Sequence, residues 1–234
     1  MIVMNRLQMN NRTNALTLIE VVSVIAVLCV LTALLLPSLA RPKRGLPGAQ
    51  CVNNLKQIGL AFRCWALDNN DKFPMQVSVT NGGTRELVES GDVYPHFLVM
   101  SNELNTPKIL YCAMESDRSR IVASTFDRAV AAGADHQLPF TNNINVTYFV
   151  GVDADQARPQ MLLSGDDNFT VSGKKLPSGL LKVWSKSPVE WTSNRHIYGG
   201  NVGMADGSVQ RFSTSKLREA LGGNGEATNR LAFP

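Results

Sequence analysis

The chain is poor in charge, in aromatic residues and in histidine. Charged residues make up 18% of its 234 residues and aromatic residues 7%, and only three histidines occur. The net charge of +4 arises from 23 Lys and Arg against 19 Asp and Glu, without a basic cluster in the body of the chain, which does not indicate a nucleic-acid-binding protein. Because 44% of the residues are hydrophobic and no internal repeat or low-complexity segment occurs, disordered and collagen-like chains are excluded.

The sequence also lacks the side-chain groupings of an active site. The three histidines share no spacing typical of metal ligands: His96, His136 and His196. His196 and Asp206 would need a nucleophile in a recognisable context to form a catalytic triad, and none is present. We therefore expect a protein that is not an enzyme, without catalytic, cofactor-binding or metal-binding residues.

The apolar residues are concentrated near the N-terminus, although the mean hydropathy of the whole chain is only -0.05. Residues 1–15 are polar and basic, whereas residues 16–40 are apolar over 25 positions. As a helix this segment would be ~37 Å long, which is enough to cross a bilayer core of ~30 Å. Glu20 is the exception within it, because a carboxylate in lipid costs a few kcal/mol without a partner. Glu20 either lies at the membrane surface or meets a positive group of another chain.

Three processing schemes compete for this N-terminus. A secretory signal would be cut after Ser38-Leu39-Ala40, but its apolar stretch should be only ~7–15 residues long. A lipoprotein signal would use Cys29, which is excluded because the preceding residue, Leu28, is too large. The third scheme cuts before the apolar segment.

The residues at that third position carry a resemblance. The segment Ala15-Leu16-Thr17-Leu18-Ile19-Glu20 resembles the cleavage and methylation motif of type IV prepilins and type II secretion pseudopilins, with Ala15 and Leu16 in place of the usual glycine and phenylalanine. The resemblance implies cleavage after Ala15 by a prepilin peptidase and N-methylation of Leu16. It also implies an ion pair between that amine and Glu20 of a neighbouring subunit, and a helix kink at Pro37.

The rest of the chain predicts an α+β domain. Residues 41–48 contain two prolines and two glycines and are expected to form a hinge. An amphipathic helix follows over 49–69, with an apolar stripe expected to lie on a sheet: Val52, Leu55, Ile58, Phe62 and Trp65. Strands are expected over 108–112, 145–153 and 160–164, and helices within 95–104, 126–132 and 215–221. Asp206-Gly207 predicts a two-residue hairpin turn that places Met204 opposite Val209.

Several patches of the domain resemble one pseudopilin-like family, of the kind found in planctomycete and verrucomicrobial-type proteomes. The patches are residues 51–61, 68–74, 148–155 and 158–160, followed by the family's closing signature: His196, nine residues, then Asp206 and Gly207. The resemblance implies a pilin-like fold, in which a long N-terminal helix spans the membrane with its first half and packs with its second half on an antiparallel sheet.

The acidic residues and the cysteines raise two questions, one about calcium binding and one about a disulfide. Asp153, Asp155, Asp166 and Asp167 have hard oxygen ligands suited to calcium, but the segment lacks a glycine-punctuated calcium loop and is better interpreted as a solvated acidic loop. Cysteines 51 and 112 lie in family-like patches, and Cys64 lies outside them on the helix, ~140° from Cys51. We therefore favour a Cys51–Cys112 disulfide, which an oxidising envelope would permit.

The sequence as a whole predicts a pseudopilin-like subunit. Its parts would be a leader (1–15), a transmembrane assembly helix (16–40), the hinge (41–48) and a periplasmic α+β domain (49–234). Its partners would be the prepilin peptidase and methyltransferase, other pilin-like subunits and the bacterial inner membrane. Basic residues flank the apolar segment on both sides, so only the resemblance places the N-terminus in the cytoplasm. The alternative is a membrane-anchored envelope protein that does not polymerise and binds a ligand through its domain.

Overall fold

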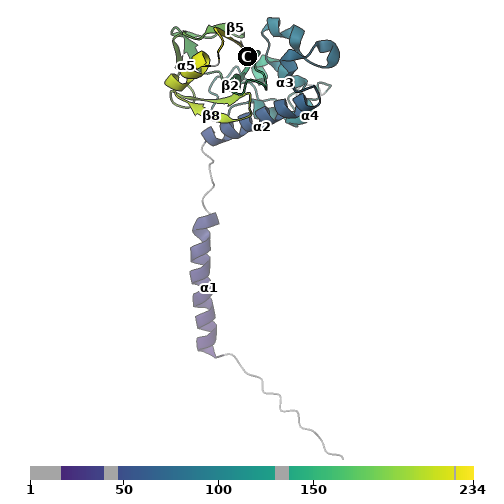
Figure 1. The fold of residues 1–234 in the computed structure, drawn as a ribbon. Helices are drawn as coiled ribbons and strands as arrows, with labels where there is room; N and C mark the ends of the chain where they lie inside the picture. Colours follow the sequence, from purple (N-terminus) through teal and green to yellow (C-terminus); the bar gives the residue numbers. More distant parts are fainter. Residues whose placement is uncertain (1–16, 40–46, 130–136, 224) are drawn as a thin grey trace, which may run out of the picture. The chain divides into compact units, whose positions relative to one another are not determined.

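The computed structural model describes residues 17–39, 47–129, 137–223 and 225–234 (Figure 1). The chain divides into two units, Met1–Arg44 and Gly45–Pro234. The cleavage position Ala15–Leu16 and most of the expected hinge lie outside the described residues.

In the described part of the first unit, residues 17–39, the structure has one helix, α1 (Leu18–Leu39), which has 22 residues and includes Pro37. Its first turn is closed by Thr17 and Glu20. The backbone N–H and the hydroxyl of Thr17 both donate to Glu20 Oε2 at 2.8 Å, and the Glu20 N–H donates to Thr17 Oγ1 at 3.4 Å. This reciprocal arrangement is a capping box, which satisfies N–H groups that have no partner within the helix.

Among the described residues, no helix has both the length and the apolar character needed to cross a membrane.

The second unit is an α+β domain. Its helix α2 (Pro47–Leu67) begins two residues before the expected start, within the segment expected to be a hinge. The expected stripe faces the core, with Leu55, Ile58, Phe62 and Trp65 buried. Figure 1 shows α2 running along one side of this unit beside β8 and α4.

The remaining elements are short. The helices are η1 (Pro74–Gln76), η2 (Val79–Asn81), η3 (Arg85–Ser90), α3 (Tyr94–Leu98), α4 (Ser101–Leu104), η4 (Pro107–Leu110), η6 (Asn143–Asn145) and α5 (Thr214–Gly223). The strands are β1 (Tyr148–Gly151), β2 (Leu162–Asp166), β3 (Phe169–Val171), β4 (Lys174–Lys175), β5 (Gly179–Trp184), β6 (Val189–Trp191), β7 (Gly200–Met204), β8 (Val209–Phe212) and β9 (Thr228–Phe233).

The strands form two antiparallel sheets. The larger has six strands in the order β5-β9-β1-β2-β7-β8, and the smaller has three in the order β4-β3-β6. Both faces of the large sheet are covered by other elements. Successive side chains of a strand point to opposite faces, so neighbouring residues of one strand enter different cores. In β1, Tyr148 and Val150 join the core beneath α2, whereas Phe149 joins a second core formed with the small sheet and α5.

Two of the expected elements are not observed among the described residues. Residues 108–112 were expected to form a strand, but Pro107 starts the 3-10 helix η4, with the Thr106 hydroxyl accepting from the Lys108 N–H at 3.4 Å. The fixed φ of proline favours such a start. The described part of the expected helix over 126–132, residues 126–129, is not helical.

The hairpin of β7 and β8 forms as expected, but its register differs by one residue. Gly203, and not Met204, lies opposite Val209. The Gly207 N–H donates to Met204 O at 2.9 Å, the Met204 N–H donates to Ser208 O at 2.8 Å, and Gly207 has φ of 85°. This is a three-residue loop, in which a turn is followed by a left-handed glycine, and the extra loop residue shifts the pairing.

Candidate functional site

The most chemically distinctive part of the domain is a buried thiol-imidazole cluster, which we define as Cys51, Cys112, His196 and Asp166. The Cys51 and Cys112 sulfurs are 2.7 Å apart, and both residues are free thiols in the structure. His196 Nε2 lies 3.3 Å from Cys112 Sγ and 3.2 Å from Asp166 Oδ2. The structure thus brings the two cysteines expected to pair into contact, and it adds two residues from distant segments.

Each member of the cluster is held by a different element. Cys51 lies on the buried face of α2. Cys112 follows η4, where its N–H donates to Thr147 Oγ1 at 2.6 Å, just before β1. Asp166 ends β2 and accepts from the backbone N–H and the side-chain amide of Asn201 in β7, at 2.7 and 3.0 Å. The cluster therefore lies where α2 meets the centre of the large sheet.

His196 begins a turn with unusual backbone geometry. His196, Ile197 and Tyr198 have successive φ values of 53°, 48° and 53°. Left-handed conformations are costly for side chains with a Cβ, and especially for a β-branched residue such as Ile197. The Arg211 guanidinium donates to His196 O at 2.8 Å and stabilises the turn. The turn directs the His196 side chain inward while Ile197 and Tyr198 remain exposed.

Hydrogen bonds in the cluster separate the pKa values of its members. The hydrogen bond with Cys112 lowers the pKa of Cys51 to about 5, and His196 contributes in the same direction. Burial opposes the charged form of His196, but hydrogen bonds with Asp166 and Cys51 raise its pKa to about 9. The hydrogen bond with Cys51 and burial raise the pKa of Cys112. This pattern favours a Cys51 thiolate beside a His196 imidazolium.

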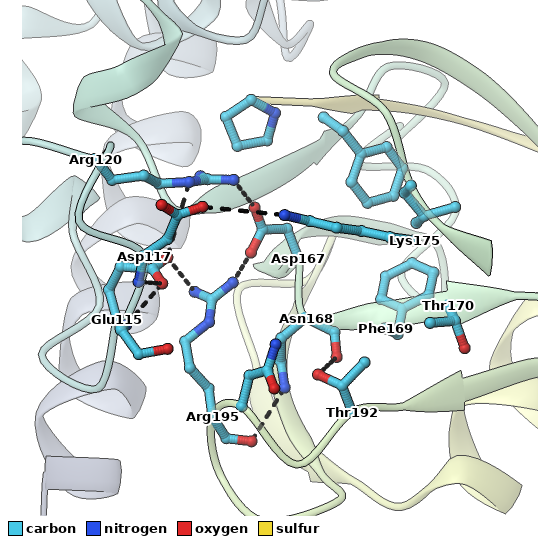
Figure 2. Close-up of a pocket in the computed structure, with 15 residues that line it drawn as sticks. Glu115, Asp117, Arg120, Asp167, Asn168, Phe169, Thr170, Lys175, Thr192 and Arg195 are labelled. Carbon is cyan, nitrogen blue, oxygen red and sulfur yellow. Dashed lines mark hydrogen bonds and ion pairs between the residues drawn. The ribbon is translucent and has the colours of Figure 1, made fainter. Parts of the chain in front are cut away.

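A second polar region lines a cavity of about 370 Å³ (Figure 2). Asp167 lies between two arginines and forms an ion pair with Arg195 and another with Arg120 at 2.6 Å. Glu115 Oε2 lies 3.4 Å from Arg195 and 3.8 Å from Arg120. The side chains of Arg195, Asp167 and Glu115 are at most 6% exposed. Two arginines and two carboxylates thus satisfy one another beside the cavity.

The interpretation of the acidic residues as a solvated loop is wrong for two of them. Asp166 is buried and the side chain of Asp167 is only 6% exposed, because β2 continues to Asp166. Asp153 pairs with Arg230 at 2.6 Å, and Asp155 accepts from Gln76 at 3.1 Å. Because the four carboxylates have different partners, the structure gives no support to the calcium hypothesis.

The other signature residues lie at the hairpin. Asp206 Oδ1 accepts from the Ser208 N–H at 2.8 Å, and Asp206 O accepts from Arg63 of α2 at 3.1 Å. His196 has its contacts in the buried cluster instead, so the three signature residues divide between a loop and that cluster. Nothing in the sequence indicated that Asp166 and Asn201 lie beside His196. Asp166 and Asn201 meet only because β2 pairs with β7 in this register.

Neither family models, nor curated proteins, nor solved structures yield a match to this chain.

Proposed function

We propose that the protein is a pseudopilin-like subunit, processed by prepilin peptidase and assembled through α1 into a fibre of a type II secretion or type IV pilus-like system. In this proposal α1 resides in the bacterial inner membrane before assembly, and the α+β domain lies in the periplasm. The protein contributes structure and contacts, without catalysing a reaction. Its partners are other pilin-like subunits and the processing enzymes.

The observation that carries the proposal is the exposed apolar surface of helix α1. Every described side chain of this helix is exposed, including Leu18, Ile19 and Val22 at 86%, 76% and 56%. A continuous apolar surface of this kind requires a cover of lipid or of other helices. In a bundle of such helices the charge of Glu20 needs a partner, because an unpaired buried charge is costly. The methylated amine of Leu16 from a neighbouring subunit would supply it.

The domain supports the same proposal at the level of architecture. Helix α2 lies with its apolar face on an antiparallel sheet, in the way that the family resemblance implies. The test is crosslinking of the full chain in membranes, combined with mass spectrometry of its N-terminus. A ladder of multimers together with a methylated Leu16 is the expected result. Monomers alone, with an intact or differently cut N-terminus, would contradict the proposal.

The cavity beside Asp167 favours a second candidate function. A membrane-anchored protein that does not polymerise would use its domain to bind a small polar ligand, and this cavity contains arginine, carboxylate and amide groups. The two candidates differ in what they require of Glu20. A helix bundle needs its charge, whereas a lone anchor does not.

A further inference from the structure

We propose that the buried thiol-imidazole cluster is a binding site for one zinc-class ion, with Cys51, Cys112, His196 and Asp166 as its ligands. This inference is independent of fibre assembly, because it concerns only the α+β domain. Thiolate sulfur, imidazole nitrogen and carboxylate oxygen are the donor types that zinc accepts in tetrahedral sites.

The first three donors already converge. The ligand atoms of Cys51, Cys112 and His196 all lie within 4.8 Å of one another, and these residues form the only such group of three or more donors among the described residues. Cys51 and Cys112 are 0% exposed and His196 is 5% exposed. A site so fully enclosed is typical of a structural ion and not of a catalytic one, which keeps an open position.

A second observation concerns Asp166, which lies outside this group of three donors but beside it, with Oδ2 3.2 Å from His196 Nε2. The residue is fully buried, and its Oδ2 accepts both hydrogen bonds from Asn201. Its other oxygen, Oδ1, is buried without a hydrogen-bond partner among the described residues. An unsatisfied buried carboxylate oxygen is costly, so a cation bound beside Asp166 would offset a penalty that the protein otherwise carries.

The distances indicate how far the donors must move. Zinc bonds of ~2.3 Å to sulfur and ~2.0 Å to nitrogen, at tetrahedral angles, place two sulfurs ~3.8 Å apart and a sulfur and a nitrogen ~3.5 Å apart. The observed Cys112–His196 separation of 3.3 Å is already close to that value. The two sulfurs, at 2.7 Å, must separate by ~1 Å.

Binding is a proton exchange without electron transfer. Cys51 is already a thiolate, whereas the Cys112 thiol and the His196 imidazolium each release one proton to solvent as the metal binds. His196, neutral after that loss, gives the lone pair of one ring nitrogen. Asn201 then acts as a positioning residue that orients Asp166. A disulfide between Cys51 and Cys112 would remove both thiolates, so the two states of the sulfurs exclude each other.

The test uses the full chain purified in detergent without chelator. We expect one zinc per chain by elemental analysis, and alkylation of both Cys51 and Cys112 after denaturation in chelator. Replacement of zinc by Co²⁺ should give thiolate-to-cobalt charge-transfer absorption. A Cys51–Cys112 disulfide in the purified chain would overturn the proposal, as would free thiols that take up no zinc or cobalt.

Variants locate the ion. C51S, H196Q and D166N should lose the bound metal, and N201A should weaken metal affinity by about 10–100-fold. C64S is the matched control, because Cys64 lies on the same helix as Cys51 but is exposed. This variant should keep one zinc ion per chain. Retention of zinc in C51S or H196Q would overturn the proposal. The cobalt spectrum of the unmodified chain decides the question even where a variant fails to fold.

Discussion

Thr17 and Glu20 hold each other across the first turn of α1, with Glu20 Oε2 2.8 Å from both the backbone nitrogen and the hydroxyl of Thr17. Glu20 therefore has a local role as a helix cap, besides the charge role proposed in assembly. Substitution by alanine would remove both roles at once. The two must be separated before any assembly defect is attributed to charge.

We predict that Glu20→Gln impairs assembly, because glutamine can still close a capping box but has no charge. The methylated amine would then enter the bundle unpaired, at a cost of roughly 3–5 kcal/mol, which corresponds to more than a hundredfold in an association constant. The measurement is the yield of crosslinked multimers from membranes. Thr17→Ala is the control, since it loses a cap worth ~1 kcal/mol but keeps the carboxylate. Equal yields from wild type and Glu20→Gln would favour the lone-anchor function.

We predict that the mature chain starts at Leu16. The basic leader and the position of Glu20, fifth from the cleavage point, indicate prepilin peptidase. Mass spectrometry of the N-terminal peptide from membranes should show Leu16 with one added methyl group. A chain that starts at Arg41 would instead indicate an ordinary signal peptidase.

We predict that Gly207→Val destabilises the domain by about 1–3 kcal/mol, because residue 207 has φ of 85°, which a β-branched residue adopts only with strain. Chemical unfolding followed by fluorescence of the buried Trp65 and Trp191 measures the effect. Gly207→Asn should cost less, since asparagine tolerates this conformation. Gly223→Ala is the control at a position with open space and no positive φ. Equal stability of Gly207→Val and wild type would contradict the proposed loop geometry.

Local sequence patterns predicted the elements that are determined by hydrophobic periodicity or by turn residues. The helical period identified α2 and its buried face, and the Asp206-Gly207 pair identified the hairpin. The exact register was missed because two-residue and three-residue loops share the same turn residues. The strand expected over 108–112 failed because apolar residues after Pro107 fit a buried 3-10 turn equally well.

The candidate sites depend on tertiary pairing and were predicted only in part. The sequence favours a Cys51–Cys112 disulfide, whereas the structure has the two cysteines in contact as free thiols. The sequence places His196 only in the closing signature, and nothing local links it with Asp166. That contact arises from the register of two strands that are separated by more than 30 residues. Arg120, Arg195 and Glu115 gave no sequence signal either, because isolated charged residues are usually solvated and only the fold brings these three together with little exposure.

We predict that Arg195→Met costs roughly 3–5 kcal/mol of unfolding free energy, since it leaves two buried carboxylates, Asp167 and Glu115, with one arginine fewer. Chemical unfolding of the full chain measures the loss. Arg85→Met is the control, because the Arg85–Glu86 pair is 60% and 48% exposed and such surface pairs contribute ~0–1 kcal/mol. Similar losses in the two variants would show that the buried network does not stabilise the fold.

We predict that His96 makes the domain less stable as the pH falls from 6.5 to 4. Its side chain is fully buried, with Nδ1 2.7 Å from Thr84 Oγ1, and burial lowers its pKa from 6.5 to about 4. The unfolded chain therefore binds a proton at His96 near pH 6.5, whereas the folded chain does so only near pH 4. The stabilisation from neutral His96 is complete above pH 6.5 and declines as the pH falls through this window. At ~1.4 kcal/mol per pH unit the loss reaches about 3 kcal/mol.

The measurement for His96 is the free energy of unfolding of wild type and His96→Gln at several pH values from 7 to 4. His96→Gln should be less stable at pH 7, because glutamine does not reproduce the packing of the ring. Its stability should nevertheless fall less steeply with acid, since no proton is taken up at this position on unfolding. Carboxylates contribute equally to both curves, so the difference between them isolates His96. Parallel curves between pH 6.5 and 4 would mean that His96 is protonated as readily in the folded domain as in the unfolded chain.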